Sequence, residues 1–153
     1  MKKLLLIIIA LLLINTVAYG QGVDAYIELL RSDARTQKVA VITEALQLTD
    51  EESTAFWPVH REYELELSEI IDDRIALIKD YAQNYDNLTN EKAKELARKV
   101  FTLEKRRTKL KKKYFKRFEK ALSAIIAAKF IQVENQINLL IDLQIATELP
   151  LIK

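Results

Sequence analysis

Residues 49–89 read TDEESTAFWPVHREYELELSEIIDDRIALIKDYAQNYDNLT and open with a helix start signal. The Thr49 hydroxyl can accept a hydrogen bond in the first turn, and the Glu52 carboxylate can accept one from the Thr49 N–H, which together form a capping box. Beyond it, mostly apolar residues recur every seven positions, at Phe56, Tyr63, Ile70 and Leu77, with His60, Leu67, Arg74 and Tyr81 interleaved. Together they form a seam, the strip of a helix that faces its partner in a coiled coil. This repeat predicts a coiled-coil-like helix over about 50–85.

A second long helix is predicted over about 91–121, where Thr89 can cap it. Its seam contains Leu96, Leu103 and Leu110, with Ala93, Val100, Arg107, Tyr114 and Ala121 interleaved. Two such helices joined by a short polar loop are expected to fold back as an antiparallel hairpin. Ser123 can cap a last helix over about 124–145. One face of that helix carries Phe130, Ile131, Glu134, Ile137, Leu140, Ile141 and Gln144.

The composition agrees with a helical protein. The chain has 153 residues with only 2 Gly, 2 Pro and no Cys, while 50% of its residues are hydrophobic and 30% charged. A sheet protein needs many more turn residues, and the lack of Cys excludes a disulfide scaffold. We predict an all-α fold: an elongated antiparallel helical hairpin with flanking helices, about four in all. Residues 24–46 predict a broken first helix, and Pro58 a kink near Thr54.

The first twenty residues have the pattern of a secretory signal. Lys2 and Lys3 precede an apolar run over residues 4–14, and Ala18 and Gly20 are the small residues that a signal peptidase requires. The run is shorter than the roughly 20 residues of a membrane-spanning helix. We therefore expect a signal peptide over 1–20, cleaved after Gly20, and a single helical domain over 21–153.

Charge is divided between the two halves of the predicted hairpin. Residues 21–90 contain 15 acidic and 6 basic residues, and residues 91–153 contain 7 acidic and 16 basic residues. The cations over 105–120 surround the helix rather than forming one stripe. Pairing with the acidic helix or in a symmetric dimer is the expected role, with acidic client segments or anionic lipid headgroups as alternatives. The candidate surface contains Lys105, Arg106, Lys109 and Lys112, and no nucleic acid partner is expected after export.

Four large apolar residues lie outside the two seams, at Trp57, Ile75, Phe101 and Phe115. A single hairpin cannot bury them together with its seams, because they lie roughly 100° to 140° away around their helices. They are therefore expected to contact the first or last helix, a second protomer or a client protein. We take them as the apolar part of the candidate client or dimer surface.

Little in the sequence is typical of catalysis. The single histidine, His60, has Glu64 one helical turn further on, and this pair is the remaining metal-binding candidate. A zinc site needs three or four ligands, so a packed histidine is the preferred interpretation. No nucleophile with a base and no glycine-rich phosphate loop is visible. The chain is expected to be no enzyme and to need no cofactor.

The two helix starts also carry a family resemblance. Leu48-Thr49 with Glu52, the segment VAVITE at 39–44 with FWPV at 56–59, and Leu122-Ser123 before AAKFIQVE at 127–134 resemble the Spy/CpxP-like (LTxxQ-motif) family of bacterial periplasmic proteins. Members of it are also labelled periplasmic metal sensors or sigma-factor sensors. Glu52 and Ile126 stand where the two motif copies have Gln.

The resemblance implies a periplasmic homodimer shaped as a shallow cradle. Such a protein holds unfolded or misfolded envelope proteins without ATP, or takes part in the envelope stress response. The alternative is a regulatory adaptor that docks on a membrane sensor protein. A metal-responsive sensor is a more remote alternative, because one His and no Cys remain in the predicted mature chain.

Overall fold

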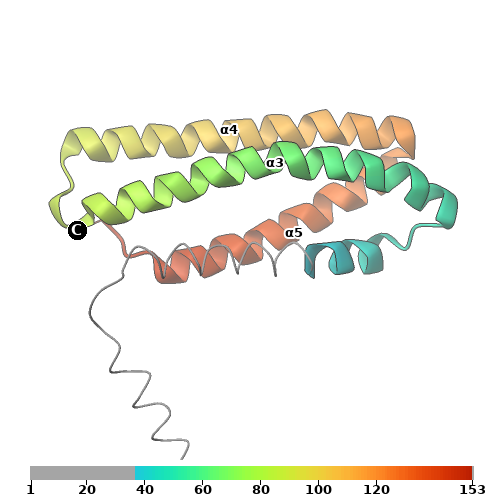
Figure 1. Cartoon of the computed structure of the whole chain (residues 1–153), viewed down its shortest axis with the longest axis horizontal. Helices are drawn as coiled ribbons and strands as arrows, with labels where there is room; N and C mark the ends of the chain where they lie inside the picture. The colour runs from blue at the N-terminus through green and yellow to red at the C-terminus, as the bar shows by residue number, and fades with distance from the viewer. Residues whose placement is uncertain (1–36, 153) are drawn as a thin grey trace, which may run out of the picture. The chain divides into compact units, whose positions relative to one another are not determined.

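The computed structural model describes residues 37–152 (Figure 1). The chain divides into two units, Met1–Val39 and Ala40–Lys153, and of the first unit only the helical residues 37–39 are described. The expected signal peptide over 1–20 and most of the expected broken helix over 24–46 lie outside the described residues.

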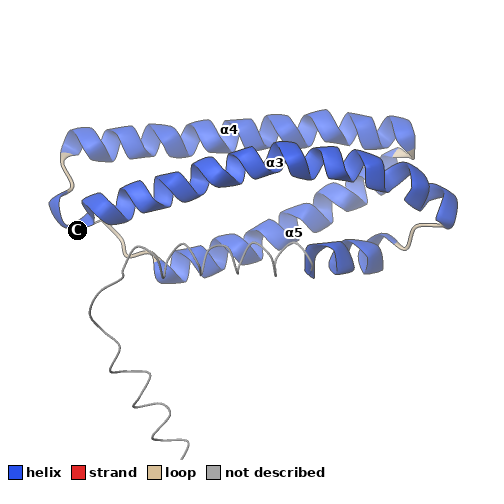
Figure 2. Ribbon diagram, viewed as in Figure 1, coloured by secondary structure: helices blue, strands red, loops and turns tan. Residues whose placement is uncertain are grey.

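The second unit is helical throughout its described length. A helix that ends at residue 46 is followed by α3 (Asp50–Asn84), the short 3-10 helix η1 (Tyr85–Asn87), α4 (Asn90–Ala121) and α5 (Ala124–Glu148). Figure 2 shows helices and loops and no strand among the residues that are described. The predicted all-α fold class is confirmed.

The three long helices begin at hydroxyl caps. Thr49 Oγ1 accepts a hydrogen bond of 3.2 Å from the Glu52 N–H, and Glu52 Oε2 accepts one of 2.9 Å from the Thr49 N–H. Thr89 Oγ1 and Ser123 Oγ each accept a bond of 3.2 Å from the backbone N–H three residues further on. Each cap satisfies a backbone donor that the first turn of a helix leaves without a partner.

Pro58 lies inside α3 without ending it. Its ring removes one backbone donor, which would otherwise bond the Thr54 carbonyl. Figure 1 shows α3 bending in its N-terminal part, the stretch that contains Pro58. The helix nevertheless continues to Asn84.

Fully buried aromatic side chains from three helices form the centre of the core. Phe56 of α3 stacks on Phe118 of α4 at 4.9 Å between ring centroids, and Phe118 lies 4.5 Å from Phe130 of α5. Tyr63 contacts Tyr114 at 5.3 Å and Phe130 at 5.4 Å, both edge to face. The core therefore belongs to the hairpin and α5 together.

Burial in α4 differs from the predicted seam near its C-terminal end. Phe118, which the seam omits, is fully buried there, whereas Ala121 is exposed. The reason is that α5 packs on the same end of α4, so the buried face turns toward Phe130. A two-helix repeat alone does not specify this rotation.

The predicted packing face of α5 is wrong at two positions. Phe130 and Glu134 are fully buried, but Leu140 is 68% exposed and Ile141 is 36% exposed. Six residues turn an α-helix by roughly 600°, which places Leu140 about 120° from Glu134 around the axis. Leu140 therefore belongs to the outward side of the helix.

Candidate functional site

The four off-seam apolar residues do not share one environment. Trp57 and Phe115 are half-buried and pack against the core, and Ile75 is also half-buried. The Trp57 ring lies 5.1 Å from that of Phe56, edge to face. Phe101 is different, since 67% of it is exposed. The aromatic surface predicted from the sequence is thus largely covered by neighbouring helices, with Phe101 as the exception.

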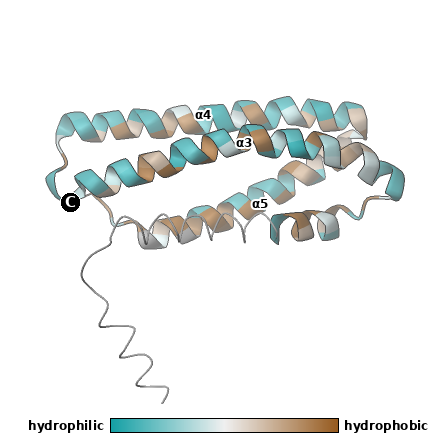
Figure 3. Ribbon diagram, in the orientation of Figure 1, coloured by the Kyte–Doolittle hydropathy of each residue, from teal (hydrophilic) through white to brown (hydrophobic). Residues whose placement is uncertain are grey.

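A larger apolar surface lies on the outward side of α5. Its mostly exposed members are Ile125, Leu139, Leu140 and Leu143. Charged residues are scarce along residues 124–147: Lys129 is exposed, Glu134 is buried, and Asp142 forms ion pairs with α3 and α4. We call the four exposed residues the α5 apolar face; Lys129, Gln132 and Gln136 are exposed on the same side of the helix, between Ile125 and Leu139. In Figure 3 hydrophobic residues recur along α5, whereas α4 is largely hydrophilic.

An open groove runs beside this face, between α4 and α5. Its volume is about 460 Å³. The lining consists of Phe115, Ala128, Ile131, Gln132, Asn135, Gln136 and Leu139. Aromatic and aliphatic side chains can contact an apolar group here, while the three amide side chains can exchange hydrogen bonds with a peptide backbone. The groove thus has the chemistry to bind an extended polypeptide segment.

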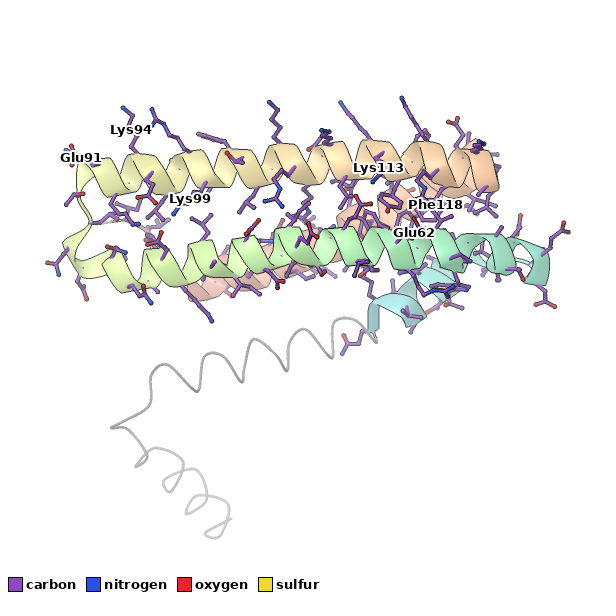
Figure 4. The ribbon with its side chains drawn as sticks, turned by 45° about the horizontal axis from the view of Figure 1, so that its top comes forward. Glu62, Glu91, Lys94, Lys99, Lys113 and Phe118 are labelled. Carbon is purple, nitrogen blue, oxygen red and sulfur yellow. The ribbon has the colours of Figure 1, made fainter. Side chains whose placement is uncertain are left out.

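The two arms of the hairpin form ion pairs with each other: α3 is the acidic arm and α4 is the basic arm. Ion pairs join Glu62 to Arg117 at 2.6 Å, Glu66 to Lys113 at 2.6 Å, Asp73 to Arg106, and Asp80 to Lys99 at 3.0 Å. Each step of four or seven residues along α3 is matched by an equal step backward along α4. Figure 4 shows Glu62, Lys99 and Lys113 in the space between the two helices, with α5 behind them.

These pairs change the acidity of their members. A hydrogen bond from Arg117 lowers the pKa of Glu62, and bonds from Lys113 and Tyr114 lower the pKa of Glu66. Burial and the hydrogen bond to Glu66 raise the pKa of Tyr114 to about 12. The carboxylates are therefore held in their charged form by the basic arm.

The four basic candidates separate into two groups. Arg106 forms an ion pair with Asp73 of α3. Lys105, Lys109 and Lys112 are exposed, and none of them has an ion pair within the described part of the chain. Arg106 thus belongs to the hairpin, and the other three remain available to a partner.

The metal candidate pair lies in an aromatic environment. His60 is buried, its Nε2 lies 3.6 Å from Glu64 Oε1, and its ring stacks on Phe56 at 5.5 Å between centroids. Residues 37–152 contain no group of three or more His, Cys, Asp or Glu side chains arranged to hold a metal ion. His60 is thus packed as a core side chain.

Sequence reasoning missed a buried polar contact next to His60. The Tyr63 hydroxyl donates a hydrogen bond of 2.8 Å to Glu134 Oε1, and Asn138 Nδ2 donates one of 3.1 Å to the same oxygen. Burial raises the pKa of Tyr63, and the negative charge of Glu134 raises it further. A carboxylate among apolar residues on one helix face is the signal that could have indicated such a partner.

Comparison with family models, curated proteins and solved structures found no match to this chain. The family resemblance in the sequence therefore stays a prediction. Within residues 37–152, no helix combines the length and the apolar character needed to cross a membrane.

Proposed function

We propose that this protein is a non-enzymatic binding protein of the periplasm that holds partly unfolded polypeptides without ATP. The observation that supports this most is the α5 apolar face. Leu139, Leu140 and Leu143 lie close together on this outward side, and a contiguous exposed apolar patch is typical of a binding surface. The secretory pattern of residues 1–20 supports the location.

The adjacent groove offers a way to hold such polypeptides. An apolar side chain of the client enters beside Phe115 and Ile131, while Gln132 and Asn135 exchange hydrogen bonds with its backbone. Burial of one leucine-sized side chain is worth about 1.5–3 kcal/mol, and part of this is lost to ordering the flexible client. A few such contacts give weak binding that reverses without an energy source.

An aggregation assay tests this proposal. Insulin aggregates when its disulfides are reduced, and the full chain at equimolar ratio, without nucleotide, is expected to suppress the light scattering. Leu139→Ser removes an apolar side chain that is 69% exposed on α5, and Leu65→Ser removes one that is 71% exposed on α3. We expect Leu139→Ser to lose most of the suppression and Leu65→Ser to keep it.

Two results would contradict the proposal. One is the absence of suppression by the unmodified chain. The other is equal loss in both leucine variants, which would mean that general surface hydrophobicity is responsible. In a third case, the α5 apolar face joins two copies of the chain instead of binding a client. Sedimentation velocity would then show a dimer that Leu139→Ser converts to a monomer, and the unmodified dimer would not suppress insulin aggregation.

A further inference from the structure

The basic residues of α4 separate into those that contact other helices and those that do not. Seven of them contact α3, α5 or a neighbouring side chain: Lys92, Lys99, Arg106, Arg107, Lys111, Lys113 and Arg117. The other seven have no ion pair within the described residues: Lys94, Arg98, Lys105, Lys109, Lys112, Lys116 and Lys120. We call this second set the basic stripe.

The basic stripe occupies a narrow part of the helix surface. At 100° per residue its seven members lie within an arc of about 80°, centred roughly 160° from the buried Leu96 and Tyr114. From Lys94 to Lys120 the stripe is about 39 Å long at 1.5 Å per residue. The cations over 105–120 taken together surround the helix, as expected, but those that lack an ion pair within residues 37–152 form one stripe. Figure 4 shows Lys94 pointing away from the other helices.

Few acidic residues lie near the stripe. Glu91 precedes it on the same side, and Glu95 and Glu119 each lie about 20° outside the arc. Glu95 forms ion pairs with Lys92 and Lys99, which are not members of the stripe. Glu104 lies about 80° outside the arc. The acidic arm does not neutralise the stripe either, because four of its carboxylates pair with α4 cations on the side that faces α3. The outward side of α4 is therefore strongly cationic.

Phe101 lies at the edge of the basic stripe. It is 67% exposed and falls between Arg98 and Lys105 along the helix, about 20° outside the arc. Helices that lie on a bilayer combine Lys and Arg with aromatic or aliphatic side chains that enter the headgroup region. The apolar face of α4 is buried in the core, so Phe101 is the aromatic side chain that α4 offers beside the stripe.

We infer that the basic stripe binds the surface of an anionic phospholipid bilayer, with α4 parallel to the membrane plane and Phe101 entering the headgroup region. A straight, one-sided row of cations contacts a plane along its whole length. The phosphates of a nucleic acid duplex curve away from such a row, and an acidic polypeptide does not present a flat array of anions with an apolar layer directly beneath it for Phe101. Each cation near an anionic leaflet strengthens binding about fivefold.

This inference is independent of the proposed function. The basic stripe and Phe101 lie on α4, and the α5 apolar face contains none of these residues. A chain that fails the aggregation assay can still bind vesicles, and a chain that suppresses aggregation can fail to bind them.

Vesicle sedimentation tests the inference with the full chain. Vesicles of phosphatidylcholine alone are compared with vesicles that also contain phosphatidylglycerol, at low and at high salt. We expect sedimentation with the anionic vesicles only, and its loss when salt shortens the Debye length from roughly 10 Å to roughly 3 Å. Binding through an apolar segment elsewhere in the chain would occur on both kinds of vesicle and would persist in salt.

Matched variants locate the contact. Lys109→Gln with Lys112→Gln removes two charges from the stripe, and we expect affinity for anionic vesicles to fall about 25-fold. Arg61→Gln with Lys129→Gln removes two exposed charges from α3 and α5, and the affinity is expected to change less than about twofold. Phe101→Ser is expected to weaken binding severalfold while leaving its salt dependence unchanged. Circular dichroism of each variant verifies that its helices are intact.

Several outcomes would overturn the inference. These are no binding to anionic vesicles at low salt, equal binding to zwitterionic vesicles, or equal loss in the two double variants. Competition adds a further one: if polyglutamate or duplex DNA displaces the protein from anionic vesicles at a lower charge concentration than free anionic vesicles do, the stripe serves a polymer rather than a membrane.

Discussion

The Tyr63 hydroxyl donates a hydrogen bond of 2.8 Å to Oε1 of Glu134, and both side chains are fully buried. The bond joins α3 to α5 across 71 positions of the sequence. A buried carboxylate is costly unless hydrogen bonds stabilise it, so the Tyr63 hydroxyl, together with Asn138 Nδ2, stabilises the packing of α5 against α3.

Replacing Tyr63 by Phe should therefore destabilise the fold by about 1–3 kcal/mol, because Glu134 loses a donor in a site closed to water. Tyr114→Phe is the matched control. Its hydroxyl bonds Glu66, which is partly exposed and can take a water molecule instead, so a loss below about 1 kcal/mol is expected. Urea unfolding at pH 7 measures both values. An equal loss of unfolding free energy in both variants would show that the buried hydrogen bond contributes no more to stability than the partly exposed one.

Ser123→Ala should lower the free energy of unfolding by about 1 kcal/mol, since the cap of α5 would be lost. Ser68→Ala is the comparison. Ser68 lies inside α3 and its hydroxyl bonds the Leu65 carbonyl, so the better helix propensity of Ala should leave stability unchanged or slightly higher. Thermal unfolding of the two variants decides the matter, and a smaller loss for Ser123→Ala than for Ser68→Ala would refute the capping role.

The ion pairs predict a loss of stability in acid. The pKa values of Glu62, Glu66 and Asp80 lie below their ordinary values of 4.5, 4.5 and 3.8 in the folded chain, because Lys and Arg side chains hold the charged form. A lowered pKa gives stability that is complete above the ordinary value and is lost as the pH falls through the lowered one. The urea midpoint should therefore drop between about pH 5 and pH 3.

Glu62→Gln combined with Glu66→Gln provides the control for this pH dependence. This variant should start less stable at pH 7 and lose less between pH 7 and pH 3, because two of the responsible carboxylates are gone. About 1 M salt should reduce the difference between the two proteins, since the pairs are exposed. An unchanged pH slope in the variant would assign the acid sensitivity to other carboxylates.

Local chemistry made the helix starts predictable. An N-cap needs only the hydroxyl of one residue and the backbone N–H three residues further on. Thr49, Thr89 and Ser123 could therefore be recognised without any tertiary information. The seven-residue repeat likewise depends on one helix at a time, and it correctly marks Phe56, Tyr63 and Leu67 as buried.

The rotation of the helices about their axes was not predictable in the same way. Phe118 is buried because α5 packs beside it, and Glu134 is buried because Tyr63 of another helix supplies a donor. Both facts depend on where a third helix lies. The same limit explains why the sequence left open whether Trp57 and Phe115 contact another helix, a second protomer or a client; in the structure they pack against the core.

The basic stripe shows a further limit of composition. Counting charges over 105–120 gives a dense cationic segment, but it does not tell which cations have carboxylate partners. The pairing of Arg106, Lys113 and Arg117 with α3, together with the contacts of Arg107 and Lys111 with α5, separates the inward cations from the outward ones. The surface offered to a partner is thus what remains after folding has neutralised the rest.

The matched steps of the hairpin ion pairs also protect the chain against misalignment while it folds. If α4 slid by one helical turn in one direction, Asp80 would meet Glu95, a like charge. In the other direction, Asp73 and Asp80 would meet Leu110 and Leu103, and the charges would lose their counterions. In the first of these slides Glu62 and Glu66 would still meet Lys113 and Lys109, and in the second Glu66 would still meet Arg117. A slide by one turn therefore removes two or three of the four ion pairs, so the charge pattern favours the observed alignment over its nearest neighbours.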